Sequence, residues 1–335
     1  MKTLSGTLKK ISYGLGCCAM TSTAMINTAN AAYPEKTITI LVGSATGGGI
    51  DLLARNVGKL ISASLATPIV IENRAGAAGL IAVEATVNAK PDGYTLLMGT
   101  GAVTALPHQQ TVSFEPTRDF SPITQFGSAA VYLLVNSSYA ASNAINSLAD
   151  FIKFAKSKPG QLNYGTTGPS STTSMTMAQF ESRTAVDIVP ITYKGTVPVA
   201  MALLAGEIHL MIGTPEQVQS QLSAGKLKAL AVTSSKRLPT MKEVPTVAEA
   251  ANLPGFNSTV WYGLLAPPKT PQDIVTRLHK ESVAAIRSPS LRAQLDGIGF
   301  EIAGSTPQEF AEFIKQDYVT QGAIVKMMNA NPRKQ

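Results

Sequence analysis

The sequence predicts an α/β protein with two lobes, and three observations carry this prediction. Short apolar segments alternate with segments of helical periodicity, which is typical of strands buried in a mostly parallel sheet with helices on its faces. The chain has 335 residues, enough for two domains that each bury a core. Glycine-rich loops follow several of the expected strands, where open α/β sheets bind their ligands.

The first 31 residues carry the pattern of an export signal rather than of a folded element. Lys2, Lys9 and Lys10 precede a modest apolar stretch over residues 11–26, and Ala29-Asn30-Ala31 offers the small residues that a signal peptidase reads. We therefore expect a periplasmic protein that is cleaved after about Ala31.

Removing this segment changes what charge and cysteines imply. It removes three lysines and no acidic residue, so the formal charge falls from +7 to +4. That charge is thinly spread, and no basic run is interleaved with aromatic residues, so we expect no nucleic-acid partner. The two cysteines, Cys17 and Cys18, leave with the signal, although lipid anchoring through one of them stays an alternative. The sequence contains no run of eighteen or more apolar residues, so no transmembrane helix is predicted.

The first expected elements follow each other as strand, helix and strand. The continuous apolar segment Thr37–Gly43 predicts a buried strand, and leucines and valines at helical spacing predict a helix over Asp51–Leu65. The pattern then predicts a strand at Pro68–Glu72, a loop at Asn73–Gly79, a helix at Ile81–Asn88 and a strand at Thr95–Gly99.

A second set of elements begins with the extended segment Val131–Val135. Strands are expected next at Leu162–Gly165, Ile188–Tyr193, Ile208–Ile212 and Lys228–Thr233. Helices are expected at Leu148–Ser157, Ser174–Thr184, Val197–Ala205 and Pro215–Ala224. After an irregular, proline-rich segment over 234–258, the pattern predicts a strand at Trp261–Ala266 and helices at Pro271–Arg287, Ser290–Ile298 and Thr306–Met328.

The order of these elements predicts that both ends of the chain build one lobe. Only three strand-helix units precede Phe120, and the part after Ser258 is too helical to stand alone. We expect lobe 1 to comprise residues 32–130 and 255–335 and lobe 2 to comprise residues 131–254. The chain would then cross between the lobes twice, near 125–135 and 235–258. Two α/β lobes with a double crossover and a cleft between them describe a periplasmic binding protein.

The first candidate binding loop lies between the first strand and the first helix. It comprises Ser44, Ala45, Thr46, Gly47, Gly48, Gly49 and Asp51. Glycines let a ligand approach the backbone, and the free N–H groups at a helix start favour an anion. Neither the P-loop lysine nor the dinucleotide spacing is present, so a carboxylate fits better than a nucleotide. A plain glycine-rich turn with Asp51 as a helix cap is the alternative.

Other expected strands end in loops of the same kind. The candidate residues in them are Thr100, Gly101, Gly165, Thr166, Thr167, Gly168, Ser170, Ser171, Thr172, Tyr193, Lys194 and Gly195. The alternative is that a Ser or Thr in the loop caps the helix that follows, but capping needs only one hydroxyl. Loops from both lobes that meet at one cleft would hold an anion through many donors, and Lys194 or Arg74 could add a cation.

Little in the sequence favours an enzyme. His108, His209 and His279 are scattered without metal-ligand spacing, and no nucleophile-elbow or zinc-protease motif is present. We expect no catalysis, no metal and no cofactor. A Rossmann-like enzyme acting on a carboxylate and a ligand sensor for a signalling partner are the alternatives.

Motifs along the whole mature chain resemble the substrate-binding proteins of tripartite tricarboxylate transporters, the Bug family of periplasmic receptors. They lie at Tyr33–Pro34, Gly47–Asp51, Val70–Ala77, Pro91–Leu97, Asp119–Ile123, Tyr164–Gly168, Tyr193–Gly195, Ala224–Ala231, Val244–Ala250 and Trp261–Leu264. The resemblance implies a type II, Venus-flytrap fold whose lobes close on a small carboxylate for delivery to a membrane permease. It also implies ligand contacts from residues 44–51 and 165–172, some through water. We expect a monomer.

Two departures from the family pattern bear on the ligand. Gly43-Ser44-Ala45-Thr46 stands where the family usually has Pro-Phe-x-Pro, and Met211-Ile212-Gly213-Thr214 stands where Met-Phe-Asp is usual. Gly213 and Thr214 therefore join the candidate site. Smaller, neutral residues suggest a roomier cleft with less negative charge, suited to an aromatic dicarboxylate such as terephthalate. Ordinary variation around an aliphatic acid of four to six carbons stays open.

Overall fold

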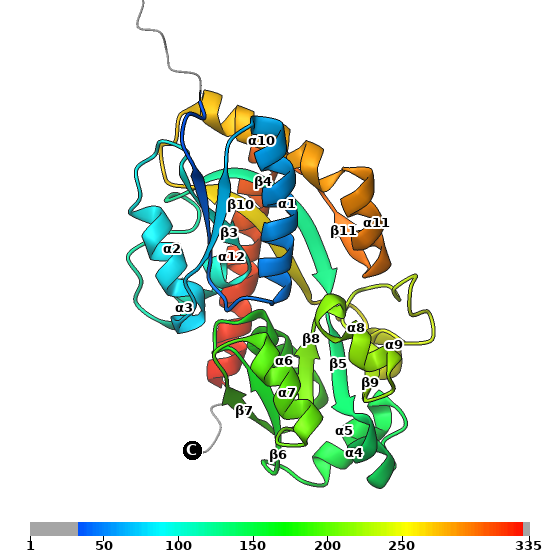
Figure 1. Cartoon of the computed structure of the whole chain (residues 1–335). Coiled ribbons are helices and arrows are strands. Elements are labelled where there is room, and N and C mark those ends of the chain that lie inside the picture. The colour runs from blue at the N-terminus through cyan, green and yellow to red at the C-terminus, as the bar shows by residue number, and fades with distance from the viewer. Residues whose placement is uncertain (1–32, 331–335) are drawn as a thin grey trace, which may run out of the picture. The chain divides into compact units, whose positions relative to one another are not determined.

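Two β-sheets organise the part of the chain that the computed structural model describes, residues 33–330 (Figure 1). The expected signal peptide lies outside these residues. The first sheet is the upper one in Figure 1 and the second the lower one, and we call each sheet with its packed helices a lobe. Within residues 33–330 no helix is both long and apolar enough to cross a bilayer.

Six strands form the first sheet, in the order β11-β4-β10-β3-β1-β2. They are β1 (Ile38–Val42), β2 (Ile69–Asn73), β3 (Thr95–Gly99), β4 (Ser121–Ala130), β10 (Thr259–Ala266) and β11 (Phe300–Ile302). β1 pairs in parallel with both β2 and β3, whereas β10 runs antiparallel to β3 and β4. Because β1, β2 and β3 are parallel, the loops that follow them gather at one edge of this sheet.

Helices cover both faces of the first sheet. One face carries α1 (Gly49–Leu65), α10 (Gln272–Ile286) and α11 (Pro289–Gly297), and the other carries α2 (Leu80–Val87), α3 (Ala102–Gln109) and α12 (Pro307–Ala330). Side chains of a strand alternate between these two cores, as β1 shows: Ile40 packs in the core under α1, and Leu41 packs in the core under α2.

Five strands form the second sheet, in the order β7-β6-β8-β5-β9. They are β5 (Tyr132–Asn136), β6 (Leu162–Thr166), β7 (Ile188–Thr192), β8 (Leu210–Gly213) and β9 (Leu227–Val232). One core lies against α4 (Ser137–Ser142), α5 (Leu148–Lys156), α6 (Thr172–Thr184) and α9 (Val247–Ala250), and the other against α7 (Thr196–Ala205) and α8 (Pro215–Ser223). β6 is parallel to β7 and β8, so the loops that open α6, α7 and α8 also share an edge.

The chain passes between the two sheets twice, from β4 to β5 and from β9 to β10 (Figure 1). The two passages are hydrogen-bonded to each other. Val131 N donates to Thr233 Oγ1 (3.1 Å), and Thr233 N donates to the Val131 carbonyl (2.9 Å). Within the second passage, Ser258 N donates to the Thr233 carbonyl (3.0 Å). The predicted two-lobed α/β fold with a double crossover is confirmed.

Helix α12 adds a further link between the lobes. It packs on α3 and β4 of the first lobe and on α6 of the second. Ala105 of α3, Met175 of α6 and Ile324 and Val325 of α12 form a small apolar cluster where these helices meet. This cluster lets one C-terminal helix support both sides of the molecule.

The structure contains several elements that the sequence pattern does not predict, and α4 is one of them. Strand β4, which contains proline and glycine, has no counterpart among the expected strands, and it pairs with β10 on one side and β11 on the other. Helix α3 begins directly after the Thr100-Gly101 loop, and β11 is only three residues long. Helix α9 interrupts the segment over 234–258 that we expected to be irregular, capped by the Thr246 side chain.

Candidate functional site

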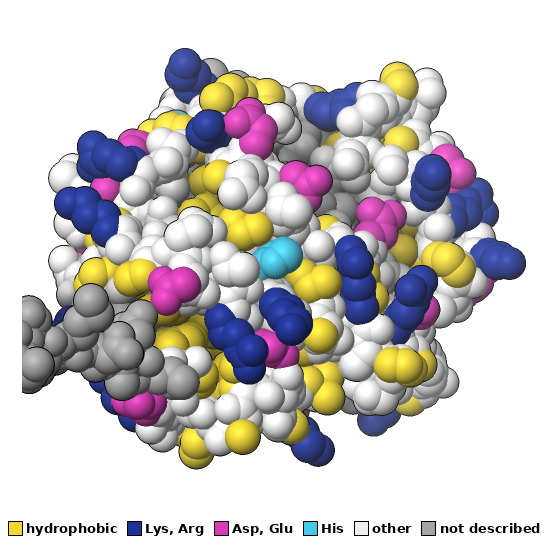
Figure 2. Space-filling view, turned by 90° about the horizontal axis from the view of Figure 1, so that it is seen from above, with side chains coloured by type: hydrophobic (Ala, Val, Ile, Leu, Met, Phe, Trp, Pro, Cys, Tyr) yellow, Lys and Arg dark blue, Asp and Glu magenta, His cyan; other side chains and the backbone are white. Residues whose placement is uncertain are grey.

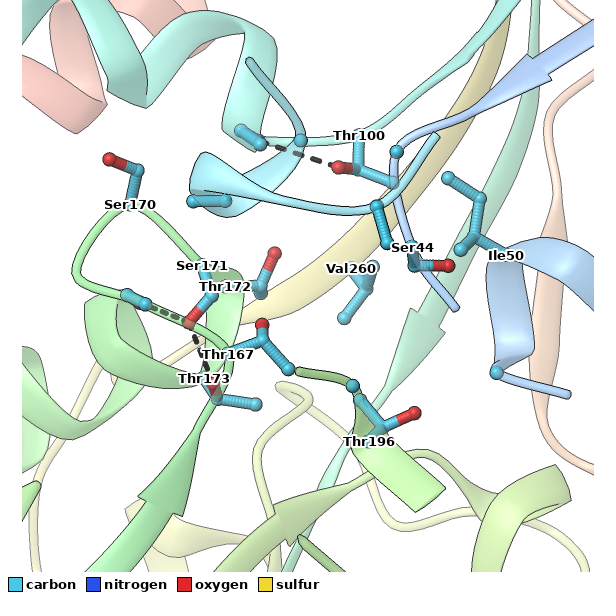
Figure 3. Close-up of a pocket in the computed structure, with 18 of the residues that line it drawn as sticks. Ser44, Ile50, Thr100, Thr167, Ser170, Ser171, Thr172, Thr173, Thr196 and Val260 are labelled. Atoms are coloured by element: carbon cyan, nitrogen blue, oxygen red, sulfur yellow. Dashed lines mark hydrogen bonds between the residues drawn. The ribbon is translucent and has the colours of Figure 1, made fainter. Parts of the chain in front are cut away.

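A cavity of about 700 Å³ lies between the two lobes (Figure 3). Figure 3 shows Ser44, Ile50 and Thr100 of the first lobe on one side and Thr167, Ser171 and Thr196 of the second lobe on the other. Its polar lining comes from the loops after β1, β3, β6, β7 and β8, and its apolar lining includes Ile50, Met98, Val260 and Tyr262. Both the size and the mixture of surfaces suit a small organic ligand.

Thirteen of the residues that we singled out in the sequence line this cavity. They are Ser44, Gly48, Gly49, Thr100, Thr167, Gly168, Ser170, Ser171, Thr172, Tyr193, Lys194, Gly195 and Thr214. They come from five separate loops, so the folded chain does bring together the loops that the pattern placed at strand ends.

Eight of the predicted residues do not line the cavity. They are Ala45, Thr46, Gly47, Asp51, Gly101, Gly165, Thr166 and Gly213. Several support residues that do line it. Thr166 anchors the loop after β6, and Gly165 is excluded from having a side chain because a Cβ there would lie 2.4 Å from Val199 Cγ1. The glycines and hydroxyls among these eight residues therefore shape the loops and do not line the cavity.

The loop between β6 and α6 is held by a cluster of hydroxyl groups. Thr166 Oγ1 is bonded to Ser174 Oγ (2.6 Å) and Ser171 Oγ (2.8 Å), and Gly168 N donates to it (3.2 Å). Ser171 Oγ also donates to the Gly168 carbonyl (2.7 Å). These groups satisfy one another within the loop, and the hydroxyls of Thr167 and Thr172 are left to face the cavity, as Figure 3 shows.

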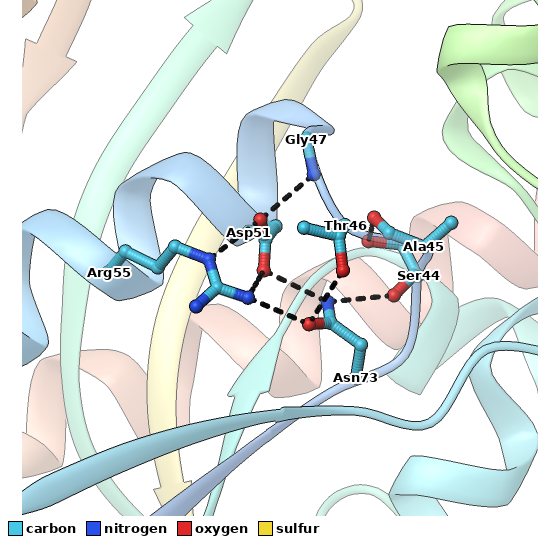
Figure 4. Close-up of polar contacts among 7 residues, drawn as sticks. All are labelled: Ser44, Ala45, Thr46, Gly47, Asp51, Arg55 and Asn73. Atoms are coloured by element: carbon cyan, nitrogen blue, oxygen red, sulfur yellow. Dashed lines mark hydrogen bonds and ion pairs between the residues drawn. The ribbon is translucent and has the colours of Figure 1, made fainter.

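The loop between β1 and α1 is held by charged and amide groups instead (Figure 4). Asp51 is 1% exposed and accepts hydrogen bonds from Gly47 N, Arg55 and Asn73. Burial alone would raise the pKa of Asp51, but the bonds from Arg55, Gly47 and Asn73 together outweigh it and hold the pKa below its ordinary value. Asp51 is therefore an ionised structural group of this loop.

Lys194 is the single charged residue among the described residues that line the cavity. Arg74, the other cation that we considered, does not line it and pairs with Glu72 (Nε to Oε1, 2.7 Å). An anion in the cavity would therefore meet mainly hydroxyls, backbone N–H groups and the starts of α1, α6 and α7, with one lysine nearby.

The two lobes touch on both sides of the cavity. Ser170 Oγ of the second lobe donates to Gln109 Oε1 of α3 (2.7 Å), and Gln109 Nε2 donates to the Pro169 carbonyl (3.1 Å). On the other side, a Cβ added at Gly195 would lie 3.0 Å from Ala45 Cβ. The structure therefore has the lobes in contact around the cavity.

Sequence reasoning missed several lining residues. The largest omission is the loop Ala75–Gly79 after β2, in which Ala77 and Ala78 have φ values of +46° and +55°. Gln110 and Gln217 were also missed. The loop after β2 could have been predicted as part of the site, because β2 is parallel to β1 and ends at the same edge of the sheet.

The three histidines lie away from the cavity lining. His108 Nε2 is bonded to the Tyr318 carbonyl (2.8 Å), His279 Nε2 to the Ser305 carbonyl (3.1 Å), and His209 Nδ1 to Asn163 Oδ1 (2.8 Å). Within residues 33–330 no group of three or more His, Cys, Asp or Glu side chains is placed to hold a metal ion.

Charge on one face of the molecule is mixed rather than concentrated. Figure 2 shows the face that points upward in Figure 1, where Lys and Arg side chains are interleaved with Asp and Glu. On this face no broad basic area of the kind that binds nucleic acid is visible.

Several solved structures resemble this chain, and a periplasmic transporter and a periplasmic binding protein are among them. The periplasmic binding protein BugD is 26% identical, with a TM-score of 0.83 over 88% of this chain and 98% of that one. Rpa4515 of R. palustris, solved with adipate, is 32% identical, with a TM-score of 0.83 over 89% and 98%. MatC of Rhodopseudomonas palustris, solved with malate, is 29% identical, with a TM-score of 0.81 over 88% and 100%.

The family model of the tripartite tricarboxylate transporter family receptor, TctC, matches residues 53–330. The chain therefore belongs to the TctC family of periplasmic solute receptors, as the sequence motifs indicated. Members of this family are periplasmic and serve a tripartite transporter.

Proposed function

We propose that this chain captures a small dicarboxylate in the cavity between its lobes and presents it to a membrane permease of the tripartite type. The observation that carries the proposal is the cavity itself, in which hydroxyl and backbone donors from five loops surround an apolar middle. Charge-assisted hydrogen bonds from such donors stabilise carboxylates strongly, and the apolar residues suit the carbon chain or ring between two carboxylates. The adipate and malate bound by two structural relatives support the same ligand class.

We further propose that the ligand is larger than a four-carbon acid, with terephthalate as the model compound. Ser44 lines the cavity at the position where the family pattern carries a phenylalanine, and the cavity reaches about 700 Å³. Gly43 is small for another reason, because a Cβ there would lie 2.8 Å from Gly79 Cα. The space beside Ser44 is therefore the feature that would admit a ring.

The same proposal includes export, oligomeric state and the boundaries of the two lobes. Export would remove residues 1–31, the mature receptor would act as a monomer without catalysis, and the two lobes would close as separate bodies around the ligand. The domain boundaries that we infer are residues 32–130 with 255–335 for lobe 1 and residues 131–254 for lobe 2. They agree with the strands of each sheet.

A thermal-shift screen tests the ligand class. Adipate, malate, succinate, citrate, terephthalate and benzoate are each added to the mature chain. A ligand at a hundred times its Kd stabilises by about 2.7 kcal/mol, which gives a clear rise in Tm. We expect the dicarboxylates to give that rise and benzoate to give little. If no compound in the panel raises the Tm, a carboxylate ligand is rejected. In a separate assay, turnover of a carboxylate with NAD would reject the proposal that the chain is a binding protein without catalysis.

The variant Ser44→Phe tests the proposed size of the ligand. It should weaken terephthalate binding while leaving succinate binding close to wild type, because only the larger ligand needs the space beside residue 44. Asn56→Phe, at an exposed position of α1 outside the cavity lining, is the control for adding a ring near this loop. Equal losses for both ligands in Ser44→Phe would show that the space argument is wrong.

A further inference from the structure

We propose that Asp51, Arg55 and Asn73 act together as positioning residues that fix the loop over residues 44–48 and neutralise a carboxylate beside the anion site. We call these three side chains the Asp51 clamp (Figure 4). None of the three lines the cavity. The inference rests on the proposed function, because the loop matters as the place where the ligand carboxylate is held.

The Asp51 carboxylate is fully used within the protein. Its Oδ2 atom accepts from Gly47 N (2.9 Å) and Arg55 Nε (3.0 Å). Its Oδ1 atom accepts from Asn73 Nδ2 (2.9 Å) and lies 2.9 Å from Arg55 Nη2. Two carboxylate oxygens offer about four lone-pair sites, and four donors occupy them. Asp51 therefore holds protein groups rather than the ligand.

Asn73 connects the loop to the neighbouring strand. It is the last residue of β2, and its Nδ2 atom donates to the Ser44 carbonyl (3.0 Å) as well as to Asp51. Its Oδ1 atom accepts from Thr46 Oγ1 (3.2 Å) and Arg55 Nη2 (3.0 Å). Ser44 and Thr46 are thus tied by Asn73, and Gly47 is tied by Asp51. This geometry leaves Gly48 and Gly49 to face the cavity.

Charge gives Arg55 a role of its own. A buried, ionised carboxylate at the start of α1 repels an anion held at the same helix start, and it cancels part of the favourable helix dipole. The Arg55 guanidinium bonds both Asp51 oxygens and removes this repulsion. Arg55 should therefore influence anion affinity without touching the ligand.

Hydrogen exchange decides the positioning role without any ligand. In Asn73→Ala, we expect amide exchange of the peptide covering residues 44–48 to rise about tenfold or more, because two ties to the strand are lost. Exchange at residues 166–171 should stay at the wild-type rate. Asn56→Ala removes an exposed asparagine of α1 and is the matched control. Wild-type exchange of residues 44–48 in Asn73→Ala would overturn the proposal, whether or not any carboxylate binds.

A charge cycle tests the neutralising role, with adipate as the probe. Arg55→Gln should weaken adipate binding by about tenfold, because Asp51 is left without its counter-charge. The double variant D51N/R55Q removes both charges and should bind adipate more tightly than Arg55→Gln alone. Arg292→Gln breaks the exposed pair with Asp296 and should leave affinity unchanged. Equal or weaker binding by the double variant would overturn the neutralising role.

The two tests separate this proposal from the proposed function. If no dicarboxylate binds the wild-type chain, the proposed function fails while the exchange experiment still decides whether Asn73 positions the loop. If adipate binds and exchange is unchanged in Asn73→Ala, the proposed function stands and the clamp does not.

Discussion

The loop after β1 and the loop after β6 occupy equivalent places in the two lobes, but different chemistry holds each of them. The first depends on an ionised carboxylate, a guanidinium and an amide that come from α1 and from the end of β2 (Figure 4). The second depends on neutral hydroxyls that all lie within residues 166–174. One cavity is therefore built from a long-range, charged support and a local, uncharged one, which should respond differently to mutation and to pH.

Removing the carboxylate from the charged support should have the largest effect. Asp51→Ala leaves the Gly47 N–H without its acceptor and Arg55 without its counter-charge, and we expect a loss of about 3 kcal/mol in the free energy of unfolding. Urea unfolding measures it. Asp296→Ala removes an exposed partner of an i,i+4 pair and should change stability by less than about 0.5 kcal/mol. If Asp51→Ala is as stable as Asp296→Ala, the Asp51 clamp contributes nothing to the free energy of unfolding.

Removing the central hydroxyl from the uncharged support should have a somewhat smaller effect. Thr166 is 2% exposed and bonds several neighbours through one oxygen, so Thr166→Val should cost about 2 kcal/mol. The loss is measured by the same urea unfolding. Thr166→Ser retains the hydroxyl and should recover most of the loss. If serine and valine are equally destabilising, packing of the methyl group rather than hydrogen bonding explains the effect.

Acid should separate the two supports. The folded-state pKa of Asp51 is below its ordinary value of about 3.9, so its contribution to stability is fully present above that value and is lost as the pH falls through the folded pKa. We expect stability to fall less steeply below about pH 4 in Asp51→Asn than in wild type. Thr166→Val should keep the wild-type slope. Parallel curves for Asp51→Asn and wild type would contradict the assigned charge.

The smallest predicted effect concerns contact between the lobes. Gln109 bonds the hydroxyl-rich loop at Pro169 and Ser170, whereas the loop after β1 meets the second lobe through small apolar contacts such as Ala45 with Gly195. Gln109→Ala should weaken adipate binding about threefold to tenfold by removing these two bonds. Gln161→Ala, an exposed glutamine of the second lobe, is the control. Calorimetric titration that gives equal affinities for both variants would exclude a role for this contact in closure.

The same contrast explains what the sequence could and could not predict. Periodicity located most strands and helices because apolar side chains face each core at regular intervals, as in α1. The loop after β6 was recognisable because its hydroxyls are adjacent in sequence. The clamp was not, because Asn73 lies 22 residues after Asp51 and its role depends on the pairing of β1 with β2.

Strand β4 shows a second limit of sequence pattern. Its proline and glycine disfavour a strand locally, and only pairing with β10 and β11, about 130 and 175 residues further along the chain, makes it regular. Long-range pairing of this kind has no local signal.

Asp51 was likewise placed among the binding residues because a carboxylate beside glycines at a helix start gives no indication of the direction of its side chain.

Hydrogen exchange of the mature chain with and without a dicarboxylate tests most directly whether both loops hold one ligand. With saturating adipate or terephthalate, we predict slower exchange at residues 44–49 and at residues 167–173 together, because ligand donors come from both loops. The loop over residues 157–161, at the far end of β6, should be unaffected. Protection of only one of the two loops, or of neither, would contradict the account of a shared carboxylate site.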